Sequence, residues 1–187
     1  MKMILFVLAE GFEELEFVAP FDILKRGGLE VVTATLGANL TVRSVRNLLI
    51  SADLTLEQAS QTSFDLVFLP GGGPGTRNLR KSPRVGELVR QQIASGREVA
   101  AICAAPLVLG DVGLLRDRKA TCFPDCMEEL RPMAKVILED RVVQDGPVFT
   151  SRGAGSAAEF GFFLLSHLGS AEKSQEVFRQ MQFTSGS

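Results

Sequence analysis

Short apolar runs alternate along this chain with segments in which apolar residues recur every three to four positions. The runs have the length of buried β-strands, and the periodic segments have one apolar face, as amphipathic helices do. Strands are expected at residues 3–9, 29–35, 65–69, 99–102 and 119–123, with up to three more within 136–151. Helices are expected from about residue 13 to 26, over 83–94, after Pro106, and over 157–168 and 171–181.

Proline and glycine mark where these elements end. Pro20 is expected to interrupt the first helix, because proline lacks the N–H that a helix interior needs, and Gly27-Gly28 ends that helix. The run Pro70-Gly71-Gly72-Gly73-Pro74-Gly75 closes the third strand abruptly. Residues 40–53 contain only short mixed apolar runs, which favour a hairpin.

The alternation of strands and helices predicts the fold class. Such chains form an open, mostly parallel α/β sheet with right-handed crossovers and helices on both faces. In these sheets the functional groups collect outside the carboxyl ends of the strands. Three loops are expected there, at residues 10–16, 71–75 and 103–106, and they supply carboxylates, bare backbone and a thiol.

The composition sets bounds on this picture. With 187 residues, 45% hydrophobic and 22% charged, the chain is expected to form one domain over residues 1–187, with a loose polar tail at 184–187. The net charge of −2 and the pI near 5.5 favour neither nucleic acid nor a membrane surface as a partner. The apolar start is too short to span a bilayer, and three cysteines are too few for a disulfide scaffold. A cytoplasmic protein with free thiols is therefore expected.

Cys103 lies where an apolar strand changes to small residues, in Val99-Ala100-Ala101-Ile102-Cys103-Ala104-Ala105-Pro106. This profile is typical of a buried strand that turns sharply into a helix. The first N–H groups of such a helix lie beside the sulfur, and their partial positive charge favours thiolate over thiol. Cys103 is therefore the candidate nucleophile, and a small buried packing residue is the alternative.

The first of the three loops is acidic, since it carries Glu10, Glu13, Glu14 and Glu16. A phosphate-binding loop needs free N–H groups and few negative charges, so nucleotide and flavin binding are not expected. Most of these carboxylates are interpreted as solvated charges at a helix start. Glu16 is flanked by apolar residues and is the candidate for a buried acid that points at the thiol. Burial there would favour its protonated form, which can donate a hydrogen bond to sulfur.

The glycines at positions 71–73 have two interpretations. They form either a tight turn that ends a strand or an open stretch of backbone whose N–H groups approach a ligand closely. Together with the N–H of Ala104, one of these amides would form an oxyanion hole for a carbonyl attacked by Cys103.

Four motifs, in this order and at this spacing, carry a family resemblance. They are Ala9-Glu10-Gly11-Phe12-Glu13-Glu14-Leu15-Glu16, Leu69-Pro70-Gly71-Gly72, Ala100-Ala101-Ile102-Cys103-Ala104-Ala105-Pro106 and Thr150-Ser151-Arg152-Gly153-Ala154-Gly155. Together they resemble the ThiJ/PfpI superfamily, and within it the Parkinson-disease-associated deglycase branch, over nearly the whole chain. The resemblance implies a flavodoxin-like three-layer α/β sandwich, usually a homodimer, which works without a cofactor.

The resemblance also implies roles for individual residues. The nucleophile of the family falls on Cys103, the acid that hydrogen-bonds its sulfur on Glu16, and the oxyanion amides on Gly72 and Ala104. In the same branch an arginine from the neighbouring subunit packs near the site and pairs with an acid of the first helix. Those positions match Arg46 and Glu13, and Arg152 is either a third rim residue or an ordinary surface arginine.

Two departures from the superfamily narrow the chemistry. Its protease-like members place a histidine directly after the nucleophile, where this chain has Ala104, and the Parkinson-associated member has a histidine near the site where this chain has Phe123. His167, the one histidine of the sequence, is expected on the flank of a closing helix. A Cys–His protease or amidotransferase needs a base within reach of the thiol, so neither activity is expected.

Chemistry on an already electrophilic carbon fits these residues. The resemblance implies glyoxalase or deglycase activity, in which Cys103 attacks a small 2-oxoaldehyde or a glycated side chain and Glu16 moves protons, as protection against carbonyl and oxidative stress. The alternative is a peroxide-responsive redox sensor or chaperone, in which Cys103 is oxidised to sulfenic and then sulfinic acid without metabolic turnover.

Cys122 and Cys126 lie four residues apart around Pro124. Two thiols without a further cysteine or histidine partner make a poor metal site, so no metal is expected. Packing is one interpretation of these two residues, and a resolving role toward Cys103 is the other.

Overall fold

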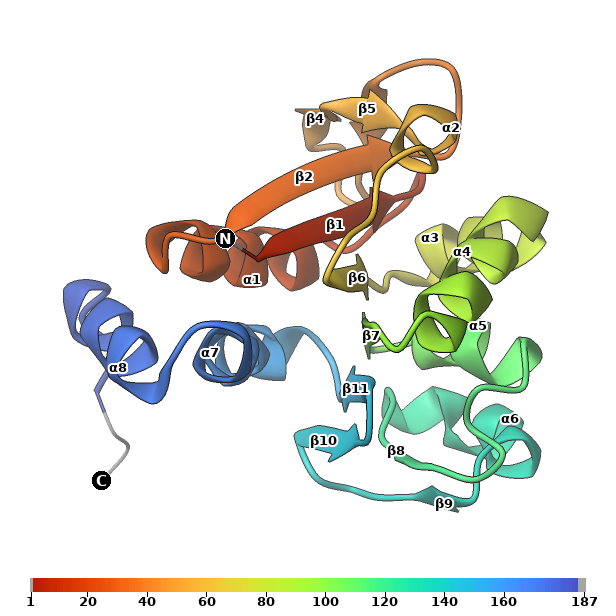
Figure 1. The fold of residues 1–187 in the computed structure, drawn as a ribbon. Coiled ribbons are helices and arrows are strands. Elements are labelled where there is room, and N and C mark those ends of the chain that lie inside the picture. Colours follow the sequence, from red (N-terminus) through yellow and green to blue (C-terminus); the bar gives the residue numbers. More distant parts are fainter. Residues whose placement is uncertain (1, 185–187) are drawn as a thin grey trace.

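The computed structural model describes residues 2–184, so the predicted loose tail lies outside the described residues apart from Thr184. A seven-stranded sheet runs through the molecule in the order β10-β11-β7-β6-β1-β2-β5 (Figure 1). Its strands are β1 (Met3–Leu8), β2 (Glu30–Thr35), β5 (Leu54–Thr55), β6 (Leu66–Leu69), β7 (Glu98–Ile102), β10 (Val142–Asp145) and β11 (Val148–Ser151). All neighbours are parallel except β10 and β11. The predicted fold class is confirmed.

Helices cover both faces of this sheet (Figure 1). On one face lie α1 (Glu14–Arg26) and α7 (Ala157–Leu168), with α8 (Ala171–Gln180) packed against α7. On the other face lie α2 (Leu56–Ala59), α3 (Gly73–Lys81), α4 (Pro83–Ala94) and α5 (Pro106–Asp111), with α6 (Met127–Leu130) beside α5. Short 3₁₀ turns are η1 (Pro124–Cys126), η2 (Arg131–Met133) and η3 (Ala154–Ser156). Within residues 2–184, no helix is both long enough and apolar enough to cross a membrane.

Strand β1 shows why the central strands are apolar throughout. Successive side chains of a strand point to opposite faces, and both faces of β1 are covered. Phe6 packs in the cluster under α1 and α7, where its ring stacks on Phe68 at 4.4 Å between centroids. Leu5 and Val7 pack in the cluster on the other face. A strand that is buried on both sides must be continuously hydrophobic, as the sequence of β1 is.

Two small sheets complete the fold. Strands β3 (Thr41–Arg43) and β4 (Leu49–Ser51) pair antiparallel, which confirms the predicted hairpin within 40–53. Strands β8 (Lys119–Ala120) and β9 (Val136–Ile137) pair parallel. The strand expected over 119–123 is shorter than predicted, because the next N–H groups bond elsewhere: that of Thr121 donates to Thr150 Oγ1 (2.9 Å) and that of Phe123 to the Cys103 carbonyl (2.8 Å).

The prediction that Pro20 interrupts the first helix is wrong, since α1 is continuous and contains Pro20. Tertiary packing accounts for this. Pro20 is buried against α7 at Gly161, where an added Cβ would lie only 3.0 Å from the Pro20 Cα. The close packing of the two helices offsets the hydrogen bond that proline cannot make.

The glycine-rich run is a shorter loop than expected. β6 ends at Leu69, and α3 already begins at Gly73. Sequence patterns miss α3 because its first turn contains glycine and proline, which are poor helix formers. They also miss β5 and α2, which have two and four residues and are too short to show a period.

Candidate active site

The carboxyl ends of β1, β6, β7 and β11 meet at one edge of the sheet. The loops that follow these strands carry the acidic segment, the glycine run, Cys103 and the small residues after Ser151. This edge is where open α/β sheets hold their functional groups. The structure therefore brings together the three loops singled out in the sequence and adds a fourth, after β11.

Cys103 sits on a sharp turn between β7 and α5. Its φ of 65° lies in the left-handed region, which a non-glycine residue rarely adopts and which marks a strained, functional position. Two hydrogen bonds hold this turn in place. The Cys103 N–H donates to the carbonyl of Ser151 (2.9 Å), and its carbonyl accepts from the N–H of Phe123 (2.8 Å). Cys103 as a whole residue is partly exposed.

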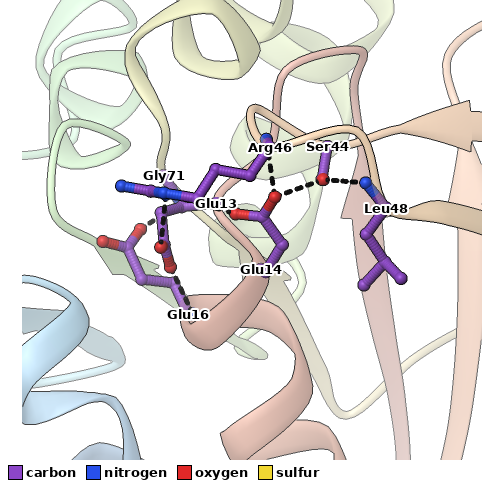
Figure 2. A network of polar contacts seen from close by, with 7 residues as sticks. All are labelled: Glu13, Glu14, Glu16, Ser44, Arg46, Leu48 and Gly71. Atoms are coloured by element: carbon purple, nitrogen blue, oxygen red, sulfur yellow. Dashed lines mark hydrogen bonds and ion pairs between the residues drawn. The ribbon is translucent and has the colours of Figure 1, made fainter.

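Glu16 lies in the first turn of α1 and is buried, with an exposed fraction of 1%. Its Oε2 accepts a hydrogen bond from the N–H of Gly71 (2.9 Å), and its backbone N–H donates to Glu13 Oε2 (2.9 Å), which caps the helix (Figure 2). The Cys103 side chain and the N–H of Ala154 also act on this carboxyl group, and both favour its ionised form. Glu16 is thus the inward-pointing acid expected from the sequence, and we refer to these two residues as the Cys103–Glu16 pair.

Glycine is required at positions 71 and 72 by close contacts. A Cβ on Gly71 would lie 2.5 Å from Glu16 Oε2 and 2.7 Å from the Cys103 Cβ. Gly72 has a φ of 93°, and a Cβ there would lie 2.5 Å from the Gly11 carbonyl oxygen. The absence of side chains lets the backbone approach the pair. The N–H groups of Gly72 and Ala104 both act on the Cys103 sulfur and favour its ionised form.

The two members of the pair influence each other's ionisation. The pKa of Glu16 is raised to about 7, chiefly by burial and also by the charge of Glu13, while hydrogen bonds from Cys103, Gly71 and Ala154 act in the opposite direction. Burial also raises the pKa of the Cys103 thiol, as do the charge of Glu16 and the hydrogen bond to it. Because both shifts disfavour the charged forms, at most one of the two groups is ionised near neutral pH.

The thiolate expected at Cys103 needs a correction. The N–H groups of Gly72 and Ala104 do lower the thiol pKa, but burial and Glu16 raise it more. The short helix α5 starts only at Pro106, three residues beyond the sulfur, so its dipole does not dominate. In the folded protein Cys103 is therefore held as a thiol near neutral pH, and attack by its sulfur needs a base that takes the thiol proton.

A second layer of polar contacts holds the start of α1 against the β3–β4 hairpin (Figure 2). Glu14 accepts from the Ser44 hydroxyl and from the backbone N–H of Arg46 (2.6 Å). The guanidinium of Arg46 reaches Glu13 Oε1 (3.1 Å) and Glu14 Oε2 (3.3 Å). The predicted pairing of Arg46 with Glu13 is present, but both residues belong to the same chain. The hairpin of the same chain places Arg46 beside α1, and the expected contribution of an arginine from the neighbouring subunit stays a prediction.

The partners of Arg152 in the structure lie outside the Cys103–Glu16 pair, and its role as a rim residue stays a prediction. Its Nη1 donates to the carbonyl of Glu139 (2.7 Å), and its charge acts on Cys122, whose thiol pKa it lowers against the larger effect of burial. Cys122 is fully buried, and burial raises its pKa to about 12; burial also raises the pKa of the partly exposed Cys126. Packing is therefore the interpretation that the structure favours for these two thiols.

His167 lies far from this edge, as expected from the sequence. It is on α7, and its Nε2 lies 2.7 Å from Glu98 Oε1, at the start of the same strand that ends before Cys103. Phe123 is 41% exposed. Within residues 2–184, no group of three or more His, Cys, Asp or Glu residues is arranged to hold a metal ion.

The motif after β11 supported the family resemblance, but sequence reasoning gave no role to its small residues. The N–H of Ala154 lowers the pKa of Glu16, and the buried hydroxyl groups of Ser151 and Ser156 lie 2.8 Å apart. Their signal in the sequence is a stretch of mostly small residues directly after a strand that ends at the same edge. Apart from Arg152, this stretch carries no charge and no thiol, so its composition gives little indication of chemistry.

Comparisons with known proteins agree with this geometry. The model of the DJ-1/PfpI family matches residues 2–167. Protein dj-1beta of Drosophila melanogaster is 39% identical over 176 residues, which are 94% of each chain, and the glutathione-independent glyoxalase DJR-1.2 of Caenorhabditis elegans is 33% identical over 92% of this chain and 91% of its own. The crystal structure of Drosophila DJ-1beta has a TM-score of 0.95 at 37% identity and covers 98% of this chain and 99% of its own. The structure of oxidized Toxoplasma gondii DJ-1 has a TM-score of 0.93 at 32% identity, over 99% and 100%.

Proposed function

This chain belongs to the DJ-1/PfpI family, and on that premise we propose that it is a cysteine-dependent enzyme which converts reactive 2-oxoaldehydes into 2-hydroxy acids without a cofactor. The observation that carries the proposal is the Cys103–Glu16 pair, in which a partly exposed cysteine on a strained turn and a buried carboxyl group lie against the same glycine, Gly71. A relative named as a glutathione-independent glyoxalase supports the substrate class. Such an activity protects a cell against carbonyl and oxidative stress.

The first step needs a base for the thiol proton. With a pKa of about 7, Glu16 is substantially ionised near neutral pH and can take that proton over its hydrogen bond to Cys103. The sulfur then attacks the aldehyde carbon, a C–S bond forms, and the carbonyl oxygen gains a proton to give a hemithioacetal. The N–H groups of Gly72 and Ala104 lie beside the sulfur, where negative charge on that oxygen develops.

The second step moves a proton between the two carbons of the substrate. Glu16 removes the proton from the carbon bonded to sulfur, the electron pair shifts toward the neighbouring ketone, and the proton returns to the ketone carbon. The product is a thioester of a 2-hydroxy acid on Cys103. Water then cleaves the C–S bond, which releases the acid and restores the thiol, so the net reaction adds one water to the 2-oxoaldehyde. The same attack on a glycated side chain would release that side chain.

Turnover of methylglyoxal to lactate tests this proposal. Cys103→Ser should abolish turnover, because a hydroxyl is a far weaker nucleophile than a thiol in this position. Glu16→Gln should lower kcat by about 10²-fold or more, the usual worth of a general base. Cys126→Ser serves as the matched control and should retain activity, since Cys126 takes no part in the pair. Full activity in Cys103→Ser would refute the scheme, and an unchanged rate in Glu16→Gln would remove Glu16 from its role.

Redox sensing is the second candidate function, and the same sulfur would perform it. Cys103 is partly exposed, and the similar Toxoplasma gondii protein is described in an oxidized form. In this scheme peroxide oxidises Cys103 to sulfenic and then sulfinic acid, and altered binding of client proteins is the output. Intact-mass measurement after mild peroxide discriminates the two functions. A gain of two oxygens at Cys103 in a protein that leaves methylglyoxal unchanged would favour the sensor.

A second copy of the chain is the partner that we propose. Large apolar side chains are exposed on α1, at Leu15 and Val18, and around the β3–β4 hairpin, at Val45, Leu48 and Leu49. The Ser44–Glu14 hydrogen bond joins these two elements. Exposed apolar side chains on neighbouring elements are typical of a protein–protein interface, so a homodimer through α1 and the hairpin would cover them. Cytoplasmic placement remains a prediction from the free cysteines.

A further inference from the structure

Two buried hydroxyl groups join the segment that holds Cys103 to the segment that holds Glu16. Ser151 ends β11 and is 0% exposed, and Ser156 ends the turn η3 and is 2% exposed. Their Oγ atoms lie 2.8 Å apart. Neither hydroxyl bonds the sulfur or the carboxyl group, so the mechanism above makes no use of them.

On one side, Ser151 fixes the position of Cys103. Its carbonyl accepts the Cys103 N–H at 2.9 Å, which ties the strained turn to the end of β11. Its hydroxyl donates to the carbonyl of Arg141 at 2.8 Å, just before β10. Hydrogen bonds of both its main chain and its side chain therefore hold Ser151 in place.

On the other side, Ser156 fixes the position of Glu16 through Ala154. The Ser156 Oγ accepts the N–H of Gly153 (3.1 Å) and lies 2.9 Å from the Gly153 carbonyl, which also accepts the Ser156 N–H (2.8 Å). These bonds close the turn that presents the N–H of Ala154 to the Glu16 carboxyl group. A turn held less tightly would present this donor less accurately.

The two hydroxyl groups depend on each other, because the acceptor that one of them chooses decides which acceptor is left for the other. Each serine hydroxyl has one proton to donate, so two protons serve three contacts: Ser151 with the Arg141 carbonyl, Ser156 with the Gly153 carbonyl, and the two hydroxyls with each other. If the Ser151 hydroxyl donates to the Arg141 carbonyl, the Ser156 hydroxyl can donate to the Ser151 oxygen. If the Ser151 hydroxyl donates to the Ser156 oxygen instead, the Ser156 hydroxyl donates to the Gly153 carbonyl. Removal of either oxygen breaks the bridge.

We propose that Ser151 and Ser156 are positioning residues, whose shared hydrogen bond sets how the Cys103 thiol and the Glu16 carboxyl group face each other. The effect of this hydrogen bond on catalysis rests on the proposed function. Its effect on the ionisation of Cys103 and Glu16 does not. It can therefore be tested without any substrate.

The expected effect has a defined sign. The titratable groups that face Glu16 are Cys103, from the turn after β7, and Glu13, from the start of α1. The N–H of Ala154 favours the ionised carboxylate. Loss of the bridge weakens this donor, so Glu16 should hold its proton to higher pH, and Cys103 should become reactive only at higher pH.

The pH at which Cys103 becomes reactive can be measured directly. Peptide mass spectrometry follows the rate of its alkylation by iodoacetamide from about pH 5 to about pH 9. In Ser156→Ala the acid limb of the profile should move up by about half a pH unit, which is about a threefold lower rate on that limb. Ser151→Ala should act in the same direction, and it keeps the test decisive where Ser156→Ala fails to fold. The double variant should shift no further than the larger single shift, because both serines act through one bond.

Ser174→Ala is the matched control, because Ser174 is a buried serine whose hydroxyl bonds the Phe162 carbonyl (2.9 Å) on α7, away from the pair. It should leave the alkylation profile unchanged. A profile in folded Ser156→Ala and Ser151→Ala that superimposes on that of the unaltered protein, or an equal shift in Ser174→Ala, would overturn the proposal. Failure of methylglyoxal turnover would refute the glyoxalase function and leave this readout intact.

Discussion

Burial of Glu16 links the stability of the protein to pH. The unfolded chain has an ordinary glutamate pKa near 4.5, whereas the folded chain holds the proton to about pH 7. Below pH 4.5 both states are protonated. Between these two pH values the unfolded state loses its proton first, so the free energy of unfolding falls as the pH rises. Above pH 7 the contribution of the Glu16 proton to this free energy is completely lost. A rise of this size corresponds to about 3 kcal/mol.

Glu16→Gln should remove this dependence. Relative to the unaltered protein, the variant should gain up to about 3 kcal/mol of unfolding free energy between about pH 5 and about pH 8, because glutamine has no proton to lose. Urea unfolding at the two pH values measures the gain. If the difference in unfolding free energy between Glu16→Gln and the unaltered protein does not change with pH, the pKa of Glu16 is not raised in the folded protein.

Glu14→Gln is the control on the same helix, and its effect should have the opposite sign. Burial opposes ionisation of Glu14, but hydrogen bonds from Ser44 and from Arg46 lower its pKa below the ordinary value. The stability that Glu14 contributes is therefore present at neutral pH and is lost in acid. Its removal should destabilise the protein more at pH 7 than at low pH.

At the scale of elements, the contact between α1 and α7 places the whole first helix, and with it Glu16. Gly161 of α7 allows this contact, because a Cβ there would lie 2.9 Å from Ile23 Cδ1 and 3.0 Å from the Pro20 Cα. The backbone of Pro20 cannot yield as a flexible side chain does, so a methyl group must push the helices apart.

Gly161→Ala should therefore destabilise the protein by about 1–3 kcal/mol, the range for overpacking, although alanine is the better helix former by about 1 kcal/mol. Gly155→Ala is the matched control, since an added Cβ at Gly155 meets nothing within 4 Å, and it should be close to neutral. Urea midpoints at one pH compare the two variants. An equal or higher stability of Gly161→Ala would show that α1 and α7 are not in rigid contact.

At the scale of the whole molecule, the proposed homodimer predicts a mass of about twice 20.2 kDa in size-exclusion chromatography with light scattering. Leu49, which is 53% exposed on β4, is the most exposed of the apolar side chains in the proposed interface. Leu49→Glu should shift the protein toward the monomer, because a charge buried without a partner disfavours association. Val136→Glu, on β9, is the control and should remain dimeric. A monomeric unaltered protein at micromolar concentration would refute the homodimer.

The amino-acid sequence by itself determined the order of most strands and helices and the α/β class. These follow from local rules, since apolar runs mark buried strands and glycine and proline mark their ends. It also indicated Cys103 as a residue at a strand–helix turn and Glu16 as an acid among apolar neighbours. In both cases the informative pattern spans only a few adjacent positions.

Only the tertiary structure decided how these groups behave. The Gly71 N–H that binds Glu16 is 55 positions away along the chain, and the serine bridge lies beyond position 150. Desolvation, which raises the pKa of both Glu16 and Cys103, is a property of everything packed around them and leaves no local signal. For the same reason the continuity of α1 through Pro20 and the pairing of Arg46 with Glu13 inside one chain could be found only once distant segments were placed side by side.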